Sequence, residues 1–109
     1  MKIEEAVTAL GALAQPSRLQ VFRLLIRAKG AQGVSAGDIA ERLDLPKPTL
    51  SFHLKELTHA GLIASRREGR TIHYQARTEG IRELMSFLTK DCCQGRPELC
   101  MPASGKCDG

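Results

Sequence analysis

Two short amphipathic segments separated by a tight turn are the feature that most restricts how this chain can fold. Ser35 and Asp38 resemble the capping pair of a short helix, and a second helix is predicted to begin at Pro48. Residues 44–47 leave room only for a tight connection, and Gly61 suits the left-handed position that ends a helix. The apolar positions with helical spacing are Ile39, Ala40 and Leu43 in the first segment and Leu50, Leu54 and Leu57 in the second. The spacing predicts a helix-turn-helix whose second helix is basic.

A β-hairpin is predicted directly after this pair of helices. Residues 62–65 and 71–75 are short β-prone runs, and between them lies Arg66-Arg67-Glu68-Gly69-Arg70, a glycine-containing turn with three arginines. A last helix is predicted over residues 79–89 from the spacing of its apolar residues. A hairpin in this position is the wing of a winged helix-turn-helix.

Two helices are predicted before the helix-turn-helix. The first carries one apolar stripe, and the second, which starts at Pro16, is apolar around most of its circumference and should be central. The stripe consists of Ile3, Ala6, Val7, Leu10 and Leu13. The predicted fold is therefore mainly α with a small β-hairpin, in the element order α-α-α-α-β-β-α. We expect residues 1–91 to form this domain and residues 92–109 to form a flexible, cysteine-rich tail, because that stretch lacks apolar periodicity.

Length and charge exclude several classes of protein. With 109 residues the chain has room for one domain and a tail, which excludes a large two-domain enzyme. No apolar run is long enough to span a bilayer, and the acidic start at residues 1–5 is unlike a signal peptide, so we expect a cytoplasmic protein. Residues 42–78 hold seven basic and three acidic residues, a surplus as large as the net charge of +4 of the whole chain. This basic middle is either a solvated surface or a site for a polyanion such as DNA.

Candidate DNA contacts come from the second helix of the pair and from the wing. With its leucines turned inward, that helix should present Lys47, Thr49, Ser51, His53 and Lys55 on the other side. Lysines neutralise phosphate, and hydroxyl groups hydrogen-bond to phosphates and base edges. In the wing, Arg67 and Arg70 are the stronger candidates for the minor groove or flanking phosphates. His53 has a second interpretation as a histidine that packs between helices.

The sequence shows no catalytic centre. The histidines lie at positions 53, 59 and 73, where no carboxylate spacing closes a zinc site, and no Ser-His-Asp or paired-carboxylate arrangement stands out. We therefore expect a protein that is not an enzyme.

Several segments in unbroken order resemble the ArsR/SmtB family of bacterial winged-helix repressors. They are Ala12-Leu13-Ala14-Gln15-Pro16-Ser17-Arg18-Leu19, Leu50-Ser51-Phe52-His53-Leu54-Lys55-Glu56-Leu57, Ala60-Gly61-Leu62-Ile63, Arg66-Arg67-Glu68-Gly69-Arg70 and Tyr74. The resemblance covers roughly residues 5–90. It implies a homodimer built on the first and last helices, with two recognition helices in successive major grooves of a near-palindromic operator. It also implies a repressor that leaves the DNA when an ion binds.

The sensing sites of this family vary in position from member to member. The Cys-x-Cys arsenic site at the third helix is absent, because residues 34–38 contain no thiol, and a zinc site on the last helix is absent, because residues 79–91 contain no histidine. Cys92, Cys93 and Cys100 resemble the C-terminal three-thiol arsenite site of some members. Three thiolates suit As(III), and Sb(III) is a related candidate. Cys107 is a candidate fourth ligand, which would suit Zn(II) or Cd(II).

The leading hypothesis is an As(III)-responsive repressor that binds operator DNA as a homodimer and dissociates when arsenite binds the three cysteines. Three alternatives stay open: a repressor of the same fold that responds to thiol oxidation or to Zn(II) or Cd(II), a metallochaperone-like interaction module, and a tail of surplus thiols without a role.

Overall fold

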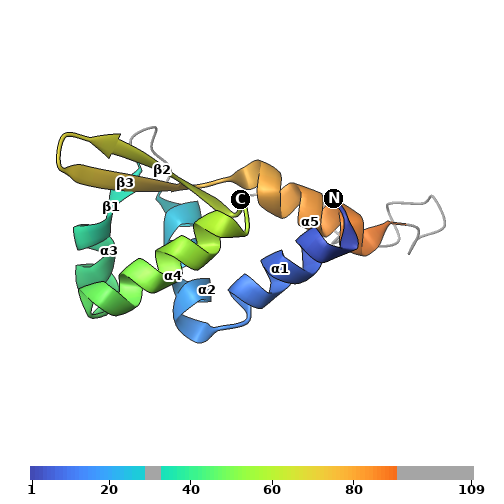
Figure 1. The fold of residues 1–109 in the computed structure, drawn as a ribbon, viewed down its shortest axis with the longest axis horizontal. Coiled ribbons are helices and arrows are strands. Elements are labelled where there is room, and N and C mark those ends of the chain that lie inside the picture. The colour runs from blue at the N-terminus through green and yellow to red at the C-terminus, as the bar shows by residue number, and fades with distance from the viewer. Residues whose placement is uncertain (29–32, 91–109) are drawn as a thin grey trace.

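The computed structural model of the chain describes residues 1–28 and 33–90, which form five helices and one three-stranded sheet (Figure 1). The helices are α1 (Ile3–Leu13), α2 (Pro16–Arg27), α3 (Ala36–Leu43), α4 (Lys47–His59) and α5 (Thr78–Thr89), and the strands are β1 (Val34–Ser35), β2 (Ile63–Glu68) and β3 (Thr71–Ala76). The predicted winged helix-turn-helix is confirmed. The predicted tail, residues 92–109, lies outside the described residues.

The helices begin where the predicted start signals stand. Pro16 is the first residue of α2, and the Ser35 Oγ atom accepts a hydrogen bond of 3.2 Å from the backbone N–H of Asp38, as the capping pair predicts. Helix α4 begins one residue earlier than predicted, so Pro48 is its second residue rather than its first. Asp44 ends α3 in the left-handed conformation, with a φ angle of 53°, and this cap allows the tight turn into α4.

The sheet contains one strand that the sequence did not predict. Strands β2 and β3 form the expected antiparallel hairpin, closed at Gly69 with a φ angle of 64°. Strand β1 adds to the other edge of β3, where Val34 lies opposite Tyr74, so the strand order is β1-β3-β2. The observed element order is therefore α-α-β-α-α-β-β-α. Two residues are too few to show the alternation by which strands are predicted, and the strand forms only because β3 offers a free edge.

The core lies where α2, α3, α4 and the base of the wing meet. Helix α2 is central, as predicted, and contacts α1, α3, α4 and β3. Its buried residues are Val21, Phe22 and Leu25, which pack in one cluster with Ile39 of α3, with Leu50, Leu54 and Leu57 of α4, and with Leu62 and Ile63 at the start of the hairpin. This cluster fixes how α4 and the wing are held relative to each other.

Helices α1 and α5 lie side by side at the end of the molecule away from the hairpin (Figure 1). The apolar stripe predicted for α1 is only partly buried. Helix α1 buries its small residues Ala6, Ala9 and Ala12 and leaves larger apolar residues exposed. The exposed apolar residues of these two helices are Ile3, Val7, Leu10, Met85 and Leu88, which we call the α1–α5 apolar stripes. None of the helices described is long and apolar enough to cross a membrane.

Candidate nucleic-acid interface

Helix α4 presents polar side chains on the side away from the core. Lys47, Thr49, Ser51 and Lys55 are all exposed, while the three leucines of α4 are buried. The first backbone N–H groups of a helix have no partner within it and carry the positive end of its dipole. The exposed side of α4 therefore combines ammonium groups, hydroxyl groups and a positive helix end, which are the groups that hydrogen-bond to phosphates and base edges.

The structure places His53 on the other side of α4. Only 6% of His53 is exposed, so the expectation that it faces outward with the lysines is wrong and its interpretation as a packing histidine is confirmed. The Arg18 Nε atom of α2 donates a hydrogen bond of 3.2 Å to His53 Nδ1. Burial and, to a smaller extent, the charge of Arg18 lower the pKa of His53. The ring is therefore held neutral, with Nδ1 as its acceptor.

Arg18 also contacts Phe52, which is exposed on α4. The guanidinium carbon of Arg18 lies 5.2 Å from the centroid of the Phe52 ring, a cation–π arrangement. The sequence pattern alone predicted no role for either residue. Phe52 does not share the spacing of the three leucines, and this departure was the signal that could have identified it as an outward-facing residue.

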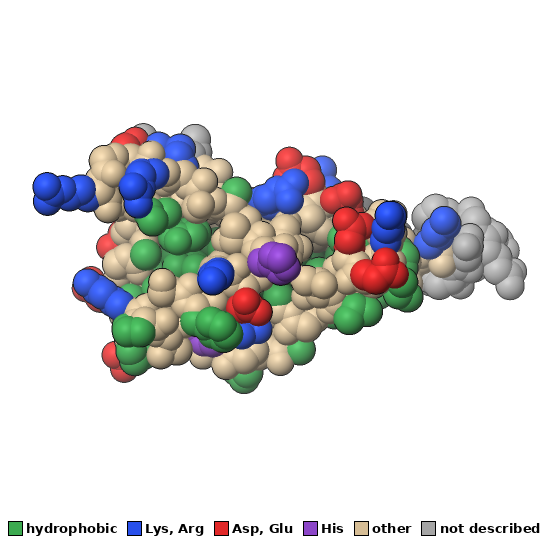
Figure 2. Space-filling view, viewed as in Figure 1, with side chains coloured by type: hydrophobic (Ala, Val, Ile, Leu, Met, Phe, Trp, Pro, Cys, Tyr) green, Lys and Arg blue, Asp and Glu red, His purple; other side chains and the backbone are tan. Residues whose placement is uncertain are grey.

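The wing carries arginines with different surroundings. Arg66 Nη1 lies 2.9 Å from Glu68 Oε2, so this arginine is paired within the hairpin. Arg67 and Arg70 are exposed, and in the part of the chain that the structure describes neither has an ion pair. In Figure 2, blue Lys and Arg side chains project around the hairpin, whereas red acidic side chains are frequent over α1 and α5. Positive charge thus gathers at the wing end of this face.

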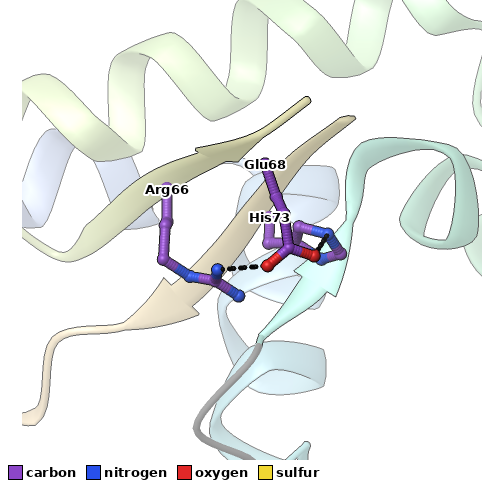
Figure 3. A network of polar contacts seen from close by, with 3 residues as sticks. All are labelled: Arg66, Glu68 and His73. Carbon is purple, nitrogen blue, oxygen red and sulfur yellow. Dashed lines mark hydrogen bonds and ion pairs between the residues drawn. The ribbon is translucent and has the colours of Figure 1, made fainter. Parts of the chain in front are cut away.

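Glu68 links Arg66 to His73 across the hairpin (Figure 3). His73 Nε2 lies 3.9 Å from Glu68 Oε1, and His73 Nδ1 is buried with no hydrogen-bond partner among residues 1–28 and 33–90. The hydrogen bond from Arg66, the charge of Arg66 and the charge of His73, in that order, lower the pKa of Glu68. The one acidic group of the wing is therefore held by the guanidinium group of Arg66, which reduces its repulsion of an approaching phosphate.

Comparison with known proteins identifies the family. A family model described as a helix-turn-helix domain matches residues 13–66. The transcriptional activator HlyU of Vibrio cholerae is 31% identical over 83% of this chain and 80% of its own length. The ArsR-like transcriptional regulator of Rhodococcus sp. RHA1 has a similar structure, with a TM-score of 0.72 and 25% identity over 89% of this chain and 88% of that one. The chain belongs to the ArsR family of winged-helix transcriptional regulators.

Membership of the ArsR family fixes the general activity. The transcriptional repressor SdpR of Bacillus subtilis is 35% identical over 72% of this chain and 88% of its own length. The chain is thus a DNA-binding transcriptional regulator and not an enzyme. The relatives include both an activator and a repressor of transcription.

The predicted sensing site of this ArsR-family chain is not among the described residues. Cys92, Cys93, Cys100 and Cys107 all lie in residues 91–109. Across the described ranges, no group of three or more His, Cys, Asp or Glu side chains is arranged to hold a metal ion. The assignment of As(III) to the cysteines stays a prediction.

Proposed function

We propose that this ArsR-family chain is a cytoplasmic transcriptional repressor that binds operator duplex DNA as a homodimer and releases it when As(III) binds the C-terminal cysteines. The observation that carries the DNA-binding part is the placement of α4 and the wing on one shared core. The exposed polar side of α4 suits the major groove, and the exposed Arg67 and Arg70 suit the adjacent phosphates or the minor groove.

The α1–α5 apolar stripes support the homodimer. Five large apolar side chains are exposed on two neighbouring helices, a concentration that marks an association surface in soluble proteins. A twofold dimer would bring each stripe against its copy and would present two α4 helices to the DNA. Successive major grooves on one side of B-DNA are about 34 Å apart, so the dimer geometry would set the operator spacing.

The inducer is proposed from the chemistry of the cysteines. Cys92, Cys93 and Cys100 offer three soft thiolates, which suit the three-coordinate As(III) and the related Sb(III). Cys107 is a candidate additional ligand, and with it Zn(II) or Cd(II) becomes the second choice. A cytosolic location keeps such thiols reduced.

Helix α5 offers a route from the cysteines to α4. It ends at Thr89, two positions before residues 91–109. Its Gly80 packs so closely on Gly61, just beyond α4, that a Cβ atom on Gly80 would overlap the Gly61 carbonyl oxygen. Arg77 Nη1 donates a 3.1 Å hydrogen bond to the same carbonyl. Ion binding beyond α5 would move α5 and, through this contact, α4. A coupling of about 1–3 kcal/mol, or 5–150-fold in affinity, is typical of allosteric proteins.

DNA binding is tested with duplexes selected from a random library by the full chain. We expect salt-dependent, sequence-specific binding, and we expect Arg67→Ala and Arg70→Ala each to reduce the slope of log affinity against log salt by about 2, because each copy of the homodimer loses one phosphate contact. Arg23→Ala, on the exposed side of α2, is the matched control and should leave the slope unchanged. Failure to select any duplex would overturn the proposed function.

The inducer is tested by fluorescence anisotropy of the reduced protein on a selected duplex titrated with arsenite. Release of the wild type, together with retention of DNA by Cys92→Ser, Cys93→Ser and Cys100→Ser, is the expected result. Cys107→Ser decides whether the fourth thiol takes part. DNA binding that arsenite does not change would keep the regulator and remove As(III) as its inducer.

Response to thiol oxidation is the second candidate function. In this candidate, oxidation joins Cys92 or Cys93 to Cys100 or Cys107 in a disulfide and thereby releases the DNA. One similar structure is described as reduced HlyU from Vibrio cholerae, with 33% identity over 80% of this chain and 90% of that one and a TM-score of 0.60. Release of DNA by peroxide but not by arsenite would favour this candidate over the first.

A further inference from the structure

Phe52 is an exposed aromatic residue in the middle of α4. It is 55% exposed, whereas Leu50, Leu54 and Leu57 of the same helix are at most 2% exposed. It precedes Lys55 by three residues, so the two side chains lie on the same face of the helix. The phenyl ring therefore belongs to the surface that the proposed function turns toward the major groove.

The Phe52 ring is held in place from one side. Arg18 of α2 lies over it at 5.2 Å, and the same arginine is fixed by its 3.2 Å hydrogen bond to the buried His53. The His53 ring adds a tilted contact, with its centroid 6.1 Å from that of Phe52. An aromatic ring that is already fixed in the free protein loses less conformational entropy when it binds, so binding costs less free energy. The free edge of the ring is thus presented in a defined position.

The location of Arg18 supports this interpretation. It is in the first turn of α2, where the helix dipole disfavours a positive charge. The local helix does not explain a cation there, but the contacts with His53 and Phe52 do. From this position Arg18 contacts both the buried His53 and the exposed Phe52.

We propose that Phe52 is a specificity-determining residue that contacts the C5-methyl group of a thymine in the major groove. A phenyl ring has no hydrogen-bonding group, and the apolar feature that the base edges offer in the major groove is the thymine methyl. Neighbouring Ser51 and Lys55 would contact hydrogen-bonding groups or phosphates, while Phe52 selects thymine at one position in each half-site. This inference rests on the proposed DNA-binding function and adds one base preference to it.

The test uses a duplex selected by the full chain and copies in which single thymines are replaced by deoxyuridine, which lacks only the methyl group. For the wild type, we expect one symmetry-related pair of replacements to weaken binding by about fourfold for each methyl lost. This factor corresponds to the free energy gained when one such apolar group is buried. Phe52→Ala should bind the thymine and deoxyuridine duplexes equally. Because Phe52 is exposed, this variant should keep the circular dichroism spectrum of the wild type.

Lys55→Ala, on the same face of α4, is the matched control. It should bind both duplexes more weakly and keep the wild-type preference for thymine, because an ammonium group does not recognise a methyl. Equal binding of thymine and deoxyuridine duplexes by the wild type would overturn this inference and leave the proposed function intact, as would a thymine preference that survives in Phe52→Ala. If no duplex is selected at all, the proposed function fails and the inference fails with it.

Discussion

The hydrogen bond from Arg18 to His53 joins α2 to α4 beneath the proposed DNA-binding surface. His53 is buried, and its Nδ1 atom accepts a hydrogen bond from Arg18 Nε. We expect Arg18→Ala to lower the free energy of unfolding by about 1–3 kcal/mol, because it leaves a buried acceptor without a partner. Urea denaturation measures this change.

Arg23→Ala is the control for the loss of a long side chain from α2. Arg23 is exposed and makes no ion pair in the described part of the chain, so its replacement should change stability by no more than about 0.5 kcal/mol. Equal stability of the two variants would show that the Arg18–His53 contact contributes nothing to folding.

His53 also predicts how stability depends on pH. Its pKa is lowered in the folded protein, first by burial and then by the charge of Arg18, so the unfolded chain binds this proton more readily. The stabilisation is complete above the unfolded pKa of about 6.5 and is lost as the pH falls from there to the lower folded pKa. The slope from this one group is at most about 1.4 kcal/mol per pH unit.

Urea denaturation between pH 5 and pH 7.5 measures this dependence. The variant His53→Gln keeps an acceptor for Arg18 but does not titrate, so its stability should vary less over this range. Glu68 contributes in a separate range, because its pKa is lowered below the usual carboxyl value and its contribution is lost only in more acidic solution. Identical pH profiles for the wild type and His53→Gln would refute the assignment.

The contacts of some of these residues can be predicted from the sequence and those of others cannot, because some contacts are local along the chain and others are not. Ser35 and Asp38 are three residues apart in one capping motif, so their hydrogen bond follows from local spacing. The position of His53 depends on Arg18, which is 35 residues away along the chain. The spacing of the leucines in α4 shows which side of the helix faces the core. How many further residues of α4 are buried depends on how α2 packs against it, and the spacing within α4 carries no information about that packing.

At the scale of helices and strands, the contact between α5 and the end of α4 is where the proposed effect of ion binding passes from α5 to α4. Gly80 lies against Gly61, and Arg77 donates hydrogen bonds to the carbonyl oxygens of Gly61 and Leu62. We expect Gly80→Ala to lower the free energy of unfolding by about 1–3 kcal/mol, because the added methyl overlaps backbone atoms that cannot rotate away. Thermal or urea unfolding measures the loss.

Gly37→Ala is the matched control in another helix. A Cβ atom at Gly37 meets nothing within 4 Å, and alanine favours the helix more than glycine does, so this variant should be as stable as the wild type or more so. If α5 carries the signal, Gly80→Ala should also reduce the release of DNA by arsenite. A stable Gly80→Ala protein with an unchanged arsenite response would argue against α5 as the route.

The elements that the sequence missed or misjudged are those made by long-range contacts. The two residues of β1 become a strand only by pairing with Tyr74 and His73 of β3. Helix α1 was predicted with a single apolar stripe, but close packing against its neighbours selects its alanines for the core and leaves Ile3 and Val7 outside. The helix-turn-helix was predictable because its caps, turn and inward leucines are all local in sequence.

At the scale of the whole molecule, the two ends of the chain's fold have different surfaces. The hairpin end carries exposed arginines, and the opposite end carries the α1–α5 apolar stripes with acidic side chains nearby (Figure 2). DNA would repel the acidic end and attract the basic end. Association through the apolar stripes would therefore leave α4 and the wing of each copy free for DNA.

Val7→Asp tests this arrangement. Val7 is 61% exposed within one copy, so an aspartate there should leave the fold intact, but in a twofold dimer it would place a charge in an apolar interface. We expect sedimentation equilibrium to show a mass of about 12 kDa instead of twice that mass. We also expect operator affinity to fall by about 10²–10⁴-fold, because the two half-sites are no longer bound by one linked dimer. Leu19→Asp, at an exposed apolar residue of α2 outside the stripes, should keep the dimer mass. A Val7→Asp protein that still has the dimer mass would place the interface elsewhere, and the spacing of the two α4 helices would then have to be derived from that other surface.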